Sequence, residues 1–204
     1  MSEKVKKVSK TAQKIQAAAT ELFANNGFDG TIMDELAAIT GANKASIYYH
    51  FKNKEGLYDK CMTDLFAEVV DPVIEAVESQ TTVIDKLEAF IVQFSISAYQ
   101  NRQMPAALMR EIASGGINMP IKARQQMQRL LFTLREILSA GKASGELDAV
   151  DPVATHFMII GSLCFYISSE PMRLEIESKT KTDPSVQDAT AEVVALIKKS
   201  LVKS

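Results

Sequence analysis

The apolar residues of this chain recur with the period of an α-helix, and this periodicity limits the fold more than any other feature. Ile15, Ala18, Ala19, Leu22 and Phe23 fall at positions i, i+3, i+4, i+7 and i+8, so they share one helical face. The alternating β-branched runs that indicate strands are missing. Only nine Gly and six Pro interrupt the 204 residues. The sequence therefore predicts an all-α fold.

Capping residues divide the N-terminal part into short helices. The segment "NNGF" ends the first, with Gly27 suited to a left-handed cap and the following Phe to a hydrophobic contact. Thr31 is expected to be the N-cap of the second helix and Gly41 its end. A third begins near Asn43, and Asn53 is the expected N-cap of the fourth.

The remaining chain predicts longer amphipathic helices, giving about nine helices in all. They are expected over 83–100, from Pro105 to "SGG" at 114–116, and over 120–144. Asp151-Pro152 and Asp183-Pro184 combine an N-cap with Pro at the first helical position, which predicts the last two helices at 152–169 and 184–202. Pro72 lies in or just after the fourth helix, where it would remove a backbone hydrogen bond and kink the helix.

Two short helices joined by a Gly-containing turn form a helix-turn-helix, whose second helix can enter a DNA major groove. The sequence therefore predicts a three-helix DNA-binding domain over 1–56. The longer helices of 57–204 predict a larger helical domain.

Composition argues against several other classes of protein. Hydrophobic residues make up 47% and charged residues 24%, as in soluble globular proteins. "MSEKVKKVSK" is not a signal peptide, and the apolar run at 157–167 is about half of the ~20 residues that a membrane-spanning helix needs. Cys61 and Cys164 lack metal-ligand spacing. We expect a reduced cytoplasmic protein without a membrane partner, a metal or a cofactor.

No enzyme motif is present: the sequence has no Gly-rich phosphate loop, GxSxG, HExxH or Cys/His cluster. We therefore expect no catalytic residue.

The stretch "NKASIYYHFKNKEGLY" at 43–58 mixes lysines with aromatic residues. Four consecutive rings, Tyr48 to Phe51, must point in several directions on a helix, so some face outward beside Lys44 and Lys54. Residues 1–60 carry nine Lys against seven acids, a local charge of +2, although the whole chain has a charge of −2. Contact with nucleic acid would therefore be local rather than spread over a basic surface.

Residues 10–58 resemble the DNA-binding domain of the TetR family of bacterial transcriptional regulators. The matching residues are Leu22-Phe23, Gly27-Phe28, Thr31, Leu36-Ala37, Gly41, Ile47-Tyr48, His50-Phe51 and Lys54-Glu55-x-Leu57. The remaining three-quarters of the chain are similar to the family only in length and helical layout.

The resemblance implies DNA contacts at the start of the second helix, along the third and at the start of the fourth. Lys44 is expected either to bind guanine or to neutralise a phosphate. One tyrosine of the pair has a packing alternative, and Tyr48 is the weaker candidate for DNA contact. Ile32, Asn43 and Ala45 depart from the family pattern. The expected DNA-binding residues are Thr31, Asn43, Lys44, Ala45, Ser46, Tyr48, Tyr49, His50 and Lys54.

In this family the two last long helices form a four-helix bundle with a second subunit, and helices five to eight enclose a mostly apolar ligand cavity. For each set, packing within the chain is the alternative. Candidate dimer residues, taken as an outward apolar set, are Phe165, Val193, Leu196, Ile197 and Leu201. Candidate ligand residues are Phe94, Met109, Ile112, Met127, Leu131, Phe157 and Ile160.

The resemblance thus implies a ligand-responsive regulator that binds a palindromic DNA operator as a homodimer. Repression, with release by a small and largely apolar effector, is the family default. The alternative is a helical small-molecule carrier whose helix-turn-helix is vestigial. A DNA-binding protein would lose affinity steeply as salt rises, whereas a carrier would not.

Overall fold

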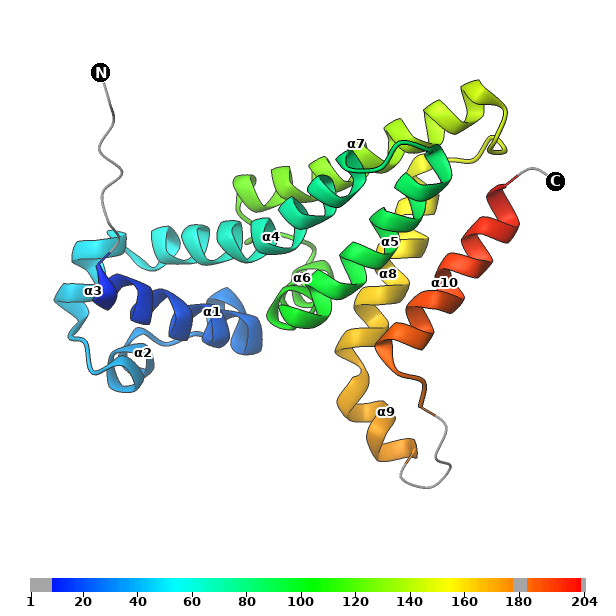
Figure 1. Ribbon diagram of the computed structural model, residues 1–204. Helices are drawn as coiled ribbons and strands as arrows, with labels where there is room; N and C mark the ends of the chain where they lie inside the picture. The colour runs from blue at the N-terminus through cyan, green and yellow to red at the C-terminus, as the bar shows by residue number, and fades with distance from the viewer. Residues whose placement is uncertain (1–8, 178–182, 203–204) are drawn as a thin grey trace, which may run out of the picture.

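The computed structural model describes residues 9–177 and 183–202. Within these residues the fold consists of ten helices and no strand, which confirms the all-α prediction (Figure 1). The N-terminal unit contains α1 (Lys10–Gly30), α2 (Met33–Thr40) and α3 (Lys44–Phe51). The others are α4 (Lys54–Glu78), α5 (Val83–Gln100), α6 (Gln103–Ala113), α7 (Ile121–Ser144), α8 (Pro152–Ser168), α9 (Glu170–Glu177) and α10 (Val186–Leu201).

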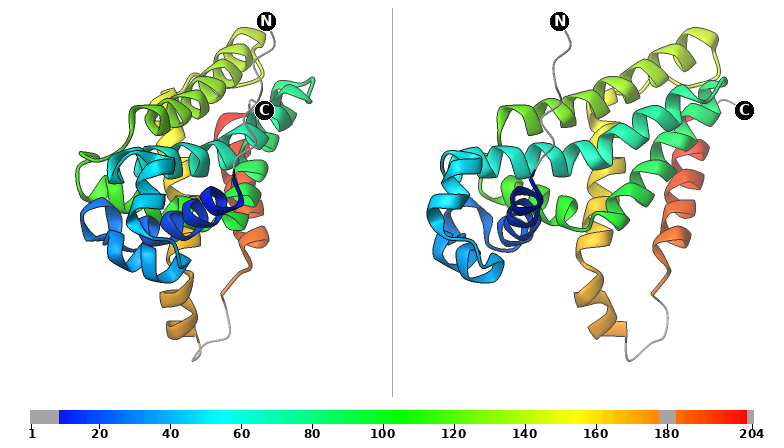
Figure 2. Two further views of the ribbon diagram at one scale, coloured as in Figure 1. Left: turned by 90° about the vertical axis from the view of Figure 1, so that its left-hand side faces the viewer. Right: turned by 60° about the vertical axis from the view of Figure 1, so that its left-hand side comes forward.

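The helices form a small unit at one end and a larger body, with α4 running through both (Figures 1 and 2). α4 packs on α1, α5 and α7, while α8 lies against α5, α6 and α7, and α10 lies mainly against α5. The domain boundary predicted between residues 56 and 57 falls within the first turn of α4. Pro72 lies inside this helix. A tilt of α4 would therefore move the small N-terminal unit relative to the larger body.

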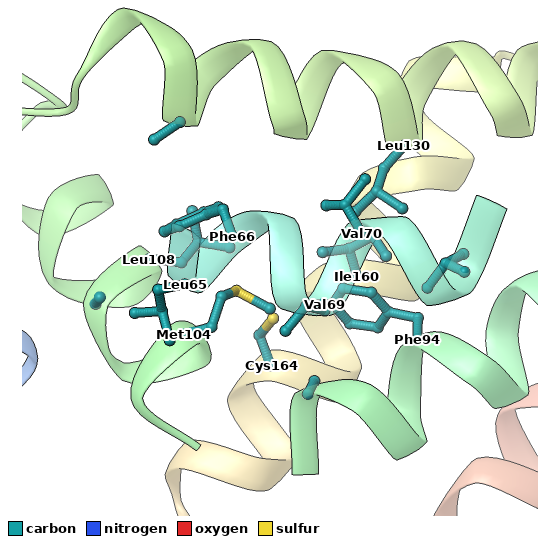
Figure 3. Packing of buried hydrophobic residues seen from close by; sticks show 14 of the residues in the cluster. Leu65, Phe66, Val69, Val70, Phe94, Met104, Leu108, Leu130, Ile160 and Cys164 are labelled. Atoms are coloured by element: carbon teal, nitrogen blue, oxygen red, sulfur yellow. The ribbon is translucent and has the colours of Figure 1, made fainter. Parts of the chain in front are cut away.

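The body is held together by large apolar side chains from most of its helices. Phe66 of α4 and Phe94 of α5 are fully buried, beside Met104 of α6 and Ile160 of α8 (Figure 3). Burying a side chain of this size stabilises the fold by roughly 1.5–3 kcal/mol. Burial raises the pKa of the Cys164 thiol, in the same cluster, to about 12. This thiol therefore behaves as a small apolar group.

Several predicted helix ends are confirmed by the capping geometry. The side chains of Asn53 and Asp151 accept hydrogen bonds from the amides of Gly56 and Ala154 at 2.8 and 2.7 Å. Gly145 caps α7 with a left-handed conformation. Gly56 is also required for space, since a Cβ there would lie 2.4 Å from the carbonyl oxygen of Phe51.

Other predicted ends were wrong. The N-cap of α10 is Ser185, which forms a capping box with Asp188, and not Asp183. Asp183 instead accepts a hydrogen bond from Arg173 Nε at 2.8 Å, and this interaction lowers the pKa of the carboxyl group. α9 was not predicted, and α6 begins at Gln103, two residues before Pro105.

The end of α1 is a kink rather than a simple left-handed stop. Gly27 has φ 73° and ψ −179°, and one more helical turn follows it. Phe28 makes the expected hydrophobic contact, with its ring 6.5 Å from that of Phe23 and 5.1 Å from that of Tyr58. The kink therefore places an aromatic ring of α1 against α4.

Candidate DNA-binding surface

The turn between α2 and α3 sets the angle at which α3 leaves the core. Gly41 adopts φ 67°, a left-handed conformation that favours glycine, and ends α2. Asn43 then caps α3 by accepting a hydrogen bond from the amide of Ser46 at 2.8 Å. Leu36 of α2 and Ile47 of α3 are fully buried. One face of α3 is thus fixed on the small core, and the other is left outside.

The outer face of α3 carries the side chains that the sequence singled out. Lys44 and Ala45 are exposed, Ser46 and His50 are half-buried. Tyr49 is 84% exposed and Tyr48 only 38% exposed. Of the two tyrosines, Tyr48 therefore has the smaller exposed area, and it is also the one for which the sequence left packing as the stronger alternative to DNA contact.

Lys44 forms an ion pair with a carboxylate of the same unit. Its Nζ lies 2.7 Å from Asp34 Oδ1 of α2, and this hydrogen bond is the main cause of a raised pKa of the Lys44 ammonium. The pair is well exposed, so water and salt weaken it. Lys44 must exchange Asp34 for a DNA group in order to bind DNA. The first turn of α2 contains two acids, Asp34 and Glu35, but their spacing from Lys44 along the chain does not predict the pair.

Thr31 was predicted to be the N-cap of α2, and this was wrong, because Ile32 occupies the N-cap position without a side-chain bond. The Thr31 side chain is 1% exposed, and its hydroxyl donates to the carbonyl of Gly27 at 2.7 Å. The kink at Gly27 frees that carbonyl and turns Thr31 inward. In this structure Thr31 joins the end of α1 to the start of α2.

Lys54, in the first turn of α4, lies against the end of α1. Its ammonium is 4.7 Å from the centroid of the Phe28 ring, and it donates to the carbonyl of Asp29 at 3.5 Å. The side chain is half-buried. α3 and the start of α4 therefore present Lys44, Tyr49, His50 and Lys54 on one end of the molecule, around the surface of α3.

Comparison with known proteins decides the family. The family model "Bacterial regulatory proteins, tetR family" matches residues 15–61. These residues cover most of α1, all of α2 and α3, and the start of α4. HTH-type regulator YhgD of Bacillus subtilis is 29% identical over 148 residues, 72% of this chain and 76% of YhgD. The helix-turn-helix unit of this chain is therefore of the TetR-family type.

A second relative is IcaR of Staphylococcus epidermidis, a negative transcriptional regulator of the biofilm operon icaADBC. It is 30% identical over 125 residues, 61% of this chain and 65% of IcaR, slightly less than two-thirds of that protein. These relatives are transcriptional regulators, and the protein is accordingly a DNA-binding transcriptional regulator.

Solved structures share the whole fold. A tetR-family regulatory protein from Rhodococcus RHA1 superposes with a TM-score of 0.79 at 21% identity, covering 97% of this chain and all of that one. FadR of Bacillus subtilis, solved in complex with stearoyl-CoA, gives a TM-score of 0.68 at 20% identity over 91% of this chain and 96% of FadR. At these identities the likeness establishes the fold.

The residues predicted to line a ligand cavity differ widely in exposure. Phe94 and Ile160 are buried in the core. Met109, Met127 and Leu131 are half-buried. Ile112 is 57% exposed, and Phe157 is 63% exposed. Their helical spacing identified apolar faces correctly but did not reveal toward which neighbour each face turns.

A groove of about 580 Å³ lies between α5 and α10. Its walls are mainly apolar and include Val92, Ile96 and Val194. At one end Lys198 Nζ lies 2.9 Å from Glu88 Oε2. The two helices are joined by a buried hydrogen bond of 2.5 Å between the hydroxyls of Ser95 and Thr190. The seven residues Glu88, Val92, Ser95, Ile96, Thr190, Val194 and Lys198 were not predicted from the sequence.

α8 and α10 also leave apolar side chains on the surface. Phe165 and Leu196 are 59% and 64% exposed, as the dimer prediction requires, and Val193 is half-buried. Ile197 and Leu201 were predicted to point outward, and this was wrong, because they are only 8% and 4% exposed. They belong to the face of α10 that packs on the body.

Three residues on the outer face of α8 were missed as members of this surface. Val153, Phe157 and Met158 are 40%, 63% and 66% exposed. Together with Phe165 and Leu196 they form what we call the α8–α10 apolar surface. A sequence signal for this surface was present, because α8 has apolar residues on both its inner and its outer face. A helix that is covered on one side only is usually polar on the other side.

A buried polar contact links α4 to α6. Tyr58 Oη donates to Glu111 Oε1 at 2.5 Å, and the second carboxylate oxygen of Glu111 is buried without a partner among the described residues. Burial is the main cause of a strongly raised pKa of the Tyr58 hydroxyl, followed by the bond to Glu111. Next to it, Arg110 Nε donates to the carbonyl of Ala24 in α1 at 3.3 Å. α6 therefore touches both helices that position the helix-turn-helix.

No helix within residues 9–177 and 183–202 is both long and apolar enough to cross a membrane.

Proposed function

We propose that this regulator binds a palindromic operator as a homodimer, represses transcription from it, and leaves the DNA when a small, largely apolar effector binds. It would act in the cytoplasm, where bacterial chromosomal DNA lies. The observation that carries the proposal is the exposed N-terminal end of α3, capped by Asn43 and bearing Lys44. In a helix-turn-helix this end of the second helix points into the major groove.

Within the proposed complex, Lys44 and Ala45 reach base edges or the nearest phosphate, and the Tyr49 hydroxyl binds a phosphate oxygen. Ser46, Tyr48, His50 and Lys54 flank this contact. Asn43 acts mainly by capping α3, since its side-chain oxygen is taken by Ser46. Thr31 acts by holding α2 in place, because its hydroxyl proton is donated to Gly27.

One helix-turn-helix makes few contacts, and two copies related by a two-fold axis place recognition helices about 34–36 Å apart, one turn of DNA. The α8–α10 apolar surface supports such a dimer. Phe157 and Phe165 are large rings that would lose their contact with water in a four-helix bundle, and burying each contributes roughly 1.5–3 kcal/mol. Phe157 therefore fits the dimer surface better than the ligand cavity.

For the effector, the α5–α10 groove is better supported than a cavity among the residues predicted from sequence. Its volume of about 580 Å³ lies within the range of small-molecule sites. Its walls are apolar, and Ser95, Thr190 and the Glu88–Lys198 pair supply a few polar groups. An effector wedged there would shift α10, which also carries part of the α8–α10 apolar surface.

Release follows if the effector favours a conformer with a different spacing of the two α3 helices. The effector shifts the equilibrium only by its difference in affinity for the two conformers, and about 10⁴-fold reverses the occupancy. α4 would transmit the change, because it is continuous from the helix-turn-helix into the body. Pro72→Ala tests whether Pro72 supplies flexibility, and unchanged effector-induced release would remove it from the mechanism.

The central test is selection of bound fragments from the source genome with purified protein at low salt. Inverted-repeat fragments that shift as a complex with two protein chains are expected. A screen of small apolar molecules for release follows, with Ala191→Trp as the groove-filling variant that should still bind DNA but no longer release it. Absence of any bound fragment at low ionic strength would contradict the proposal.

A further inference from the structure

A hollow of about 350 Å³ lies where the N-terminal unit meets the body. Three segments form its walls: Phe28 at the end of α1, the first turns of α4, and the loop between α6 and α7. Arg124 of α7 holds this loop by donating to the carbonyl of Gly116 at 2.8 Å. Asn118 of the loop donates to Asp29 Oδ2 at 3.3 Å and so ties it to α1. We call this place the junction hollow.

Two acidic side chains of α4 line the junction hollow. Glu55 and Asp59 are four residues apart and therefore share one face of the helix. Within the described part of the chain, neither carboxylate pairs with a lysine, arginine or histidine. Like charges at this spacing repel each other and weaken a helix. Glu55 is compensated by the positive end of α4, whereas Asp59 lies beyond the first turn. A cation between the two carboxylates would remove the repulsion.

The rest of the wall is aromatic and apolar. The rings of Phe28 and Tyr58 meet edge to face with centroids 5.1 Å apart. Because the Tyr58 hydroxyl donates to Glu111, Tyr58 offers its ring to the hollow. Ile117 of the loop also lines it and is 81% exposed. The Lys54 ammonium lies 4.7 Å from the centroid of Phe28, which shows that this ring accepts a cation at contact distance.

A third acidic group lies behind Tyr58. Glu111 is 4% exposed, and its Oε2 has no partner among the residues that the structure describes. A buried oxygen without a partner adds to the negative potential around it, because the interior screens charge weakly. Among the same residues, no three His, Cys, Asp or Glu side chains come together as a metal site. The surroundings therefore favour a cation with an apolar part over a metal ion.

We propose that the junction hollow binds a small organic cation, an alkyl- or arylammonium. Its ammonium group lies between the carboxylates of Glu55 and Asp59, and its apolar part packs on Phe28, Tyr58 and Ile117. The site is separate from the α5–α10 groove, and it does not depend on the proposed binding of DNA. Because such a ligand touches α1, α4 and the α6–α7 loop, it ties the helix-turn-helix unit to the body.

The test uses 4-phenylbutylamine, which is a cation at neutral pH. Its controls are 4-phenylbutanol, which is neutral, and 4-phenylbutyrate, which is an anion. Two-dimensional NMR spectra of the isotope-labelled full chain locate binding from the amide shifts. The amine should shift the amides of 55–59 and 117–118 with a dissociation constant of about 1 mM, in keeping with its small size. The alcohol should bind about fivefold more weakly or less, and the anion should cause no shift there.

Three variants separate charge from shape. Asp59→Asn removes one carboxylate with little change of volume and should weaken binding of the amine about three- to tenfold. Ile117→Ser should weaken the amine and the alcohol alike, by about threefold. Glu75→Gln, at an exposed acid of α4 outside the hollow, is the matched control and should change nothing. Thermal unfolding should match the wild type in all three, since none of these side chains belongs to the core.

Four results would overturn the proposed cation site. Equal affinity for the amine and the alcohol would mean that the carboxylates contribute nothing. Amide shifts confined to the α5–α10 groove would place the amine elsewhere. An equal loss of affinity in Glu75→Gln would indicate an effect of net charge only. The fourth is the lack of any shift at the hollow at about 20 mM amine, well above the expected dissociation constant. DNA binding, measured separately by gel shift, is untouched by each of these results.

Discussion

Two surfaces of this molecule expose aromatic rings, and they differ in what surrounds the rings. On α3, Tyr49 is 84% exposed beside Lys44 and His50. On α8, Phe157 and Phe165 are 63% and 59% exposed, and residues 152–168 contain no Asp, Glu, Lys or Arg. The first surface is polar and cationic, and the second is neutral and apolar.

The comparison shows that exposure of a ring does not by itself identify the partner. Rings with hydroxyls among ammonium groups suit a phosphate backbone, which needs hydrogen-bond donors and positive charge. Rings among Met and Leu suit another apolar protein surface, which needs no charge but a large contact area. The two surfaces also lie at opposite ends of the molecule, so that a dimer through α8 leaves α3 free (Figure 1).

The largest expected effect, on the proposed dimer, comes from introducing positive charge into the α8–α10 apolar surface. Phe157→Lys combined with Phe165→Lys should dissociate the dimer and abolish operator binding. Loss of two central aromatic contacts at about 2 kcal/mol each corresponds to a roughly 10³-fold weaker dimer. Light scattering after size-exclusion chromatography gives the mass, and a gel shift gives the DNA affinity. Phe132→Lys, 52% exposed on α7, is the control that should remain dimeric.

A second prediction concerns the buried inner face of α8, which contrasts with the exposed outer face of the same helix. His156 is 3% exposed, its Nδ1 has no partner among the described residues, and burial lowers its pKa to about 4. The unfolded chain therefore takes up a proton near pH 6.5 that the folded chain takes up only near pH 4. The free energy of unfolding should fall by about 2–3 kcal/mol from pH 7 to pH 4 because of this residue.

Urea unfolding at a series of pH values measures this effect against His156→Leu, which cannot titrate. The variant should lose that part of the pH dependence. Cys164→Ala, a change at another buried position of α8, should be destabilised by a similar amount at every pH. Equal pH dependence in wild type and His156→Leu would show that the inner face of α8 is open to water.

The buried hydrogen bond between Tyr58 of α4 and Glu111 of α6 is expected to have an intermediate effect. Tyr58→Phe removes the donor to Glu111 and leaves both oxygens of a buried carboxylate without a partner, which should cost about 1–3 kcal/mol. Tyr48→Phe, on the outer face of α3, should change the free energy of unfolding by less than about 0.5 kcal/mol. Adding Glu111→Met to Tyr58→Phe should restore much of the stability, whereas an additive loss would contradict this account.

The smallest effect is expected at the ion pair on the α3 surface. Asp34→Asn frees Lys44, so binding to a random duplex should tighten a few-fold, while Lys44→Gln should make the salt slope shallower by about one unit per lost phosphate contact. Glu35→Gln removes the same charge from the same turn of α2 and serves as the control. Equal gains from Asp34→Asn and Glu35→Gln would mean that only the local charge matters and not the pair.

Much of the N-terminal unit could be predicted because its determinants are local. The third helix was predicted to begin near Asn43 and the fourth to be capped by Asn53, and each of these side chains accepts a hydrogen bond from an amide three residues later. Where a distant group competes, the local prediction failed. Asp183 was expected to cap α10, but the Arg173 guanidinium, 10 residues away in the chain, binds its carboxylate instead.

The short helix α9 was missed for a similar reason. The segment "EPMRLEIE" has only 8 residues, and a helix of this length gains little from its own hydrogen bonds. Contacts with other segments hold its start: Glu170 pairs with Arg102, the N-cap residue of α6, and Arg173 lies over the Tyr166 ring at 3.6 Å. None of these contacts can be read from spacing along the chain.

The sequence by itself determined the all-α class, most of the helices, some of their caps such as Asn53 and Asp151, and that rings and lysines meet at the start of α3. Only the tertiary structure decided which apolar face is covered. Leu196 and Ile197 are neighbours of similar hydrophobicity, yet the first is 64% exposed and the second 8% exposed. Periodicity gives the angle between two side chains on a helix, but burial depends on where α5 and α8 lie around that helix, which is a property of the packed chain.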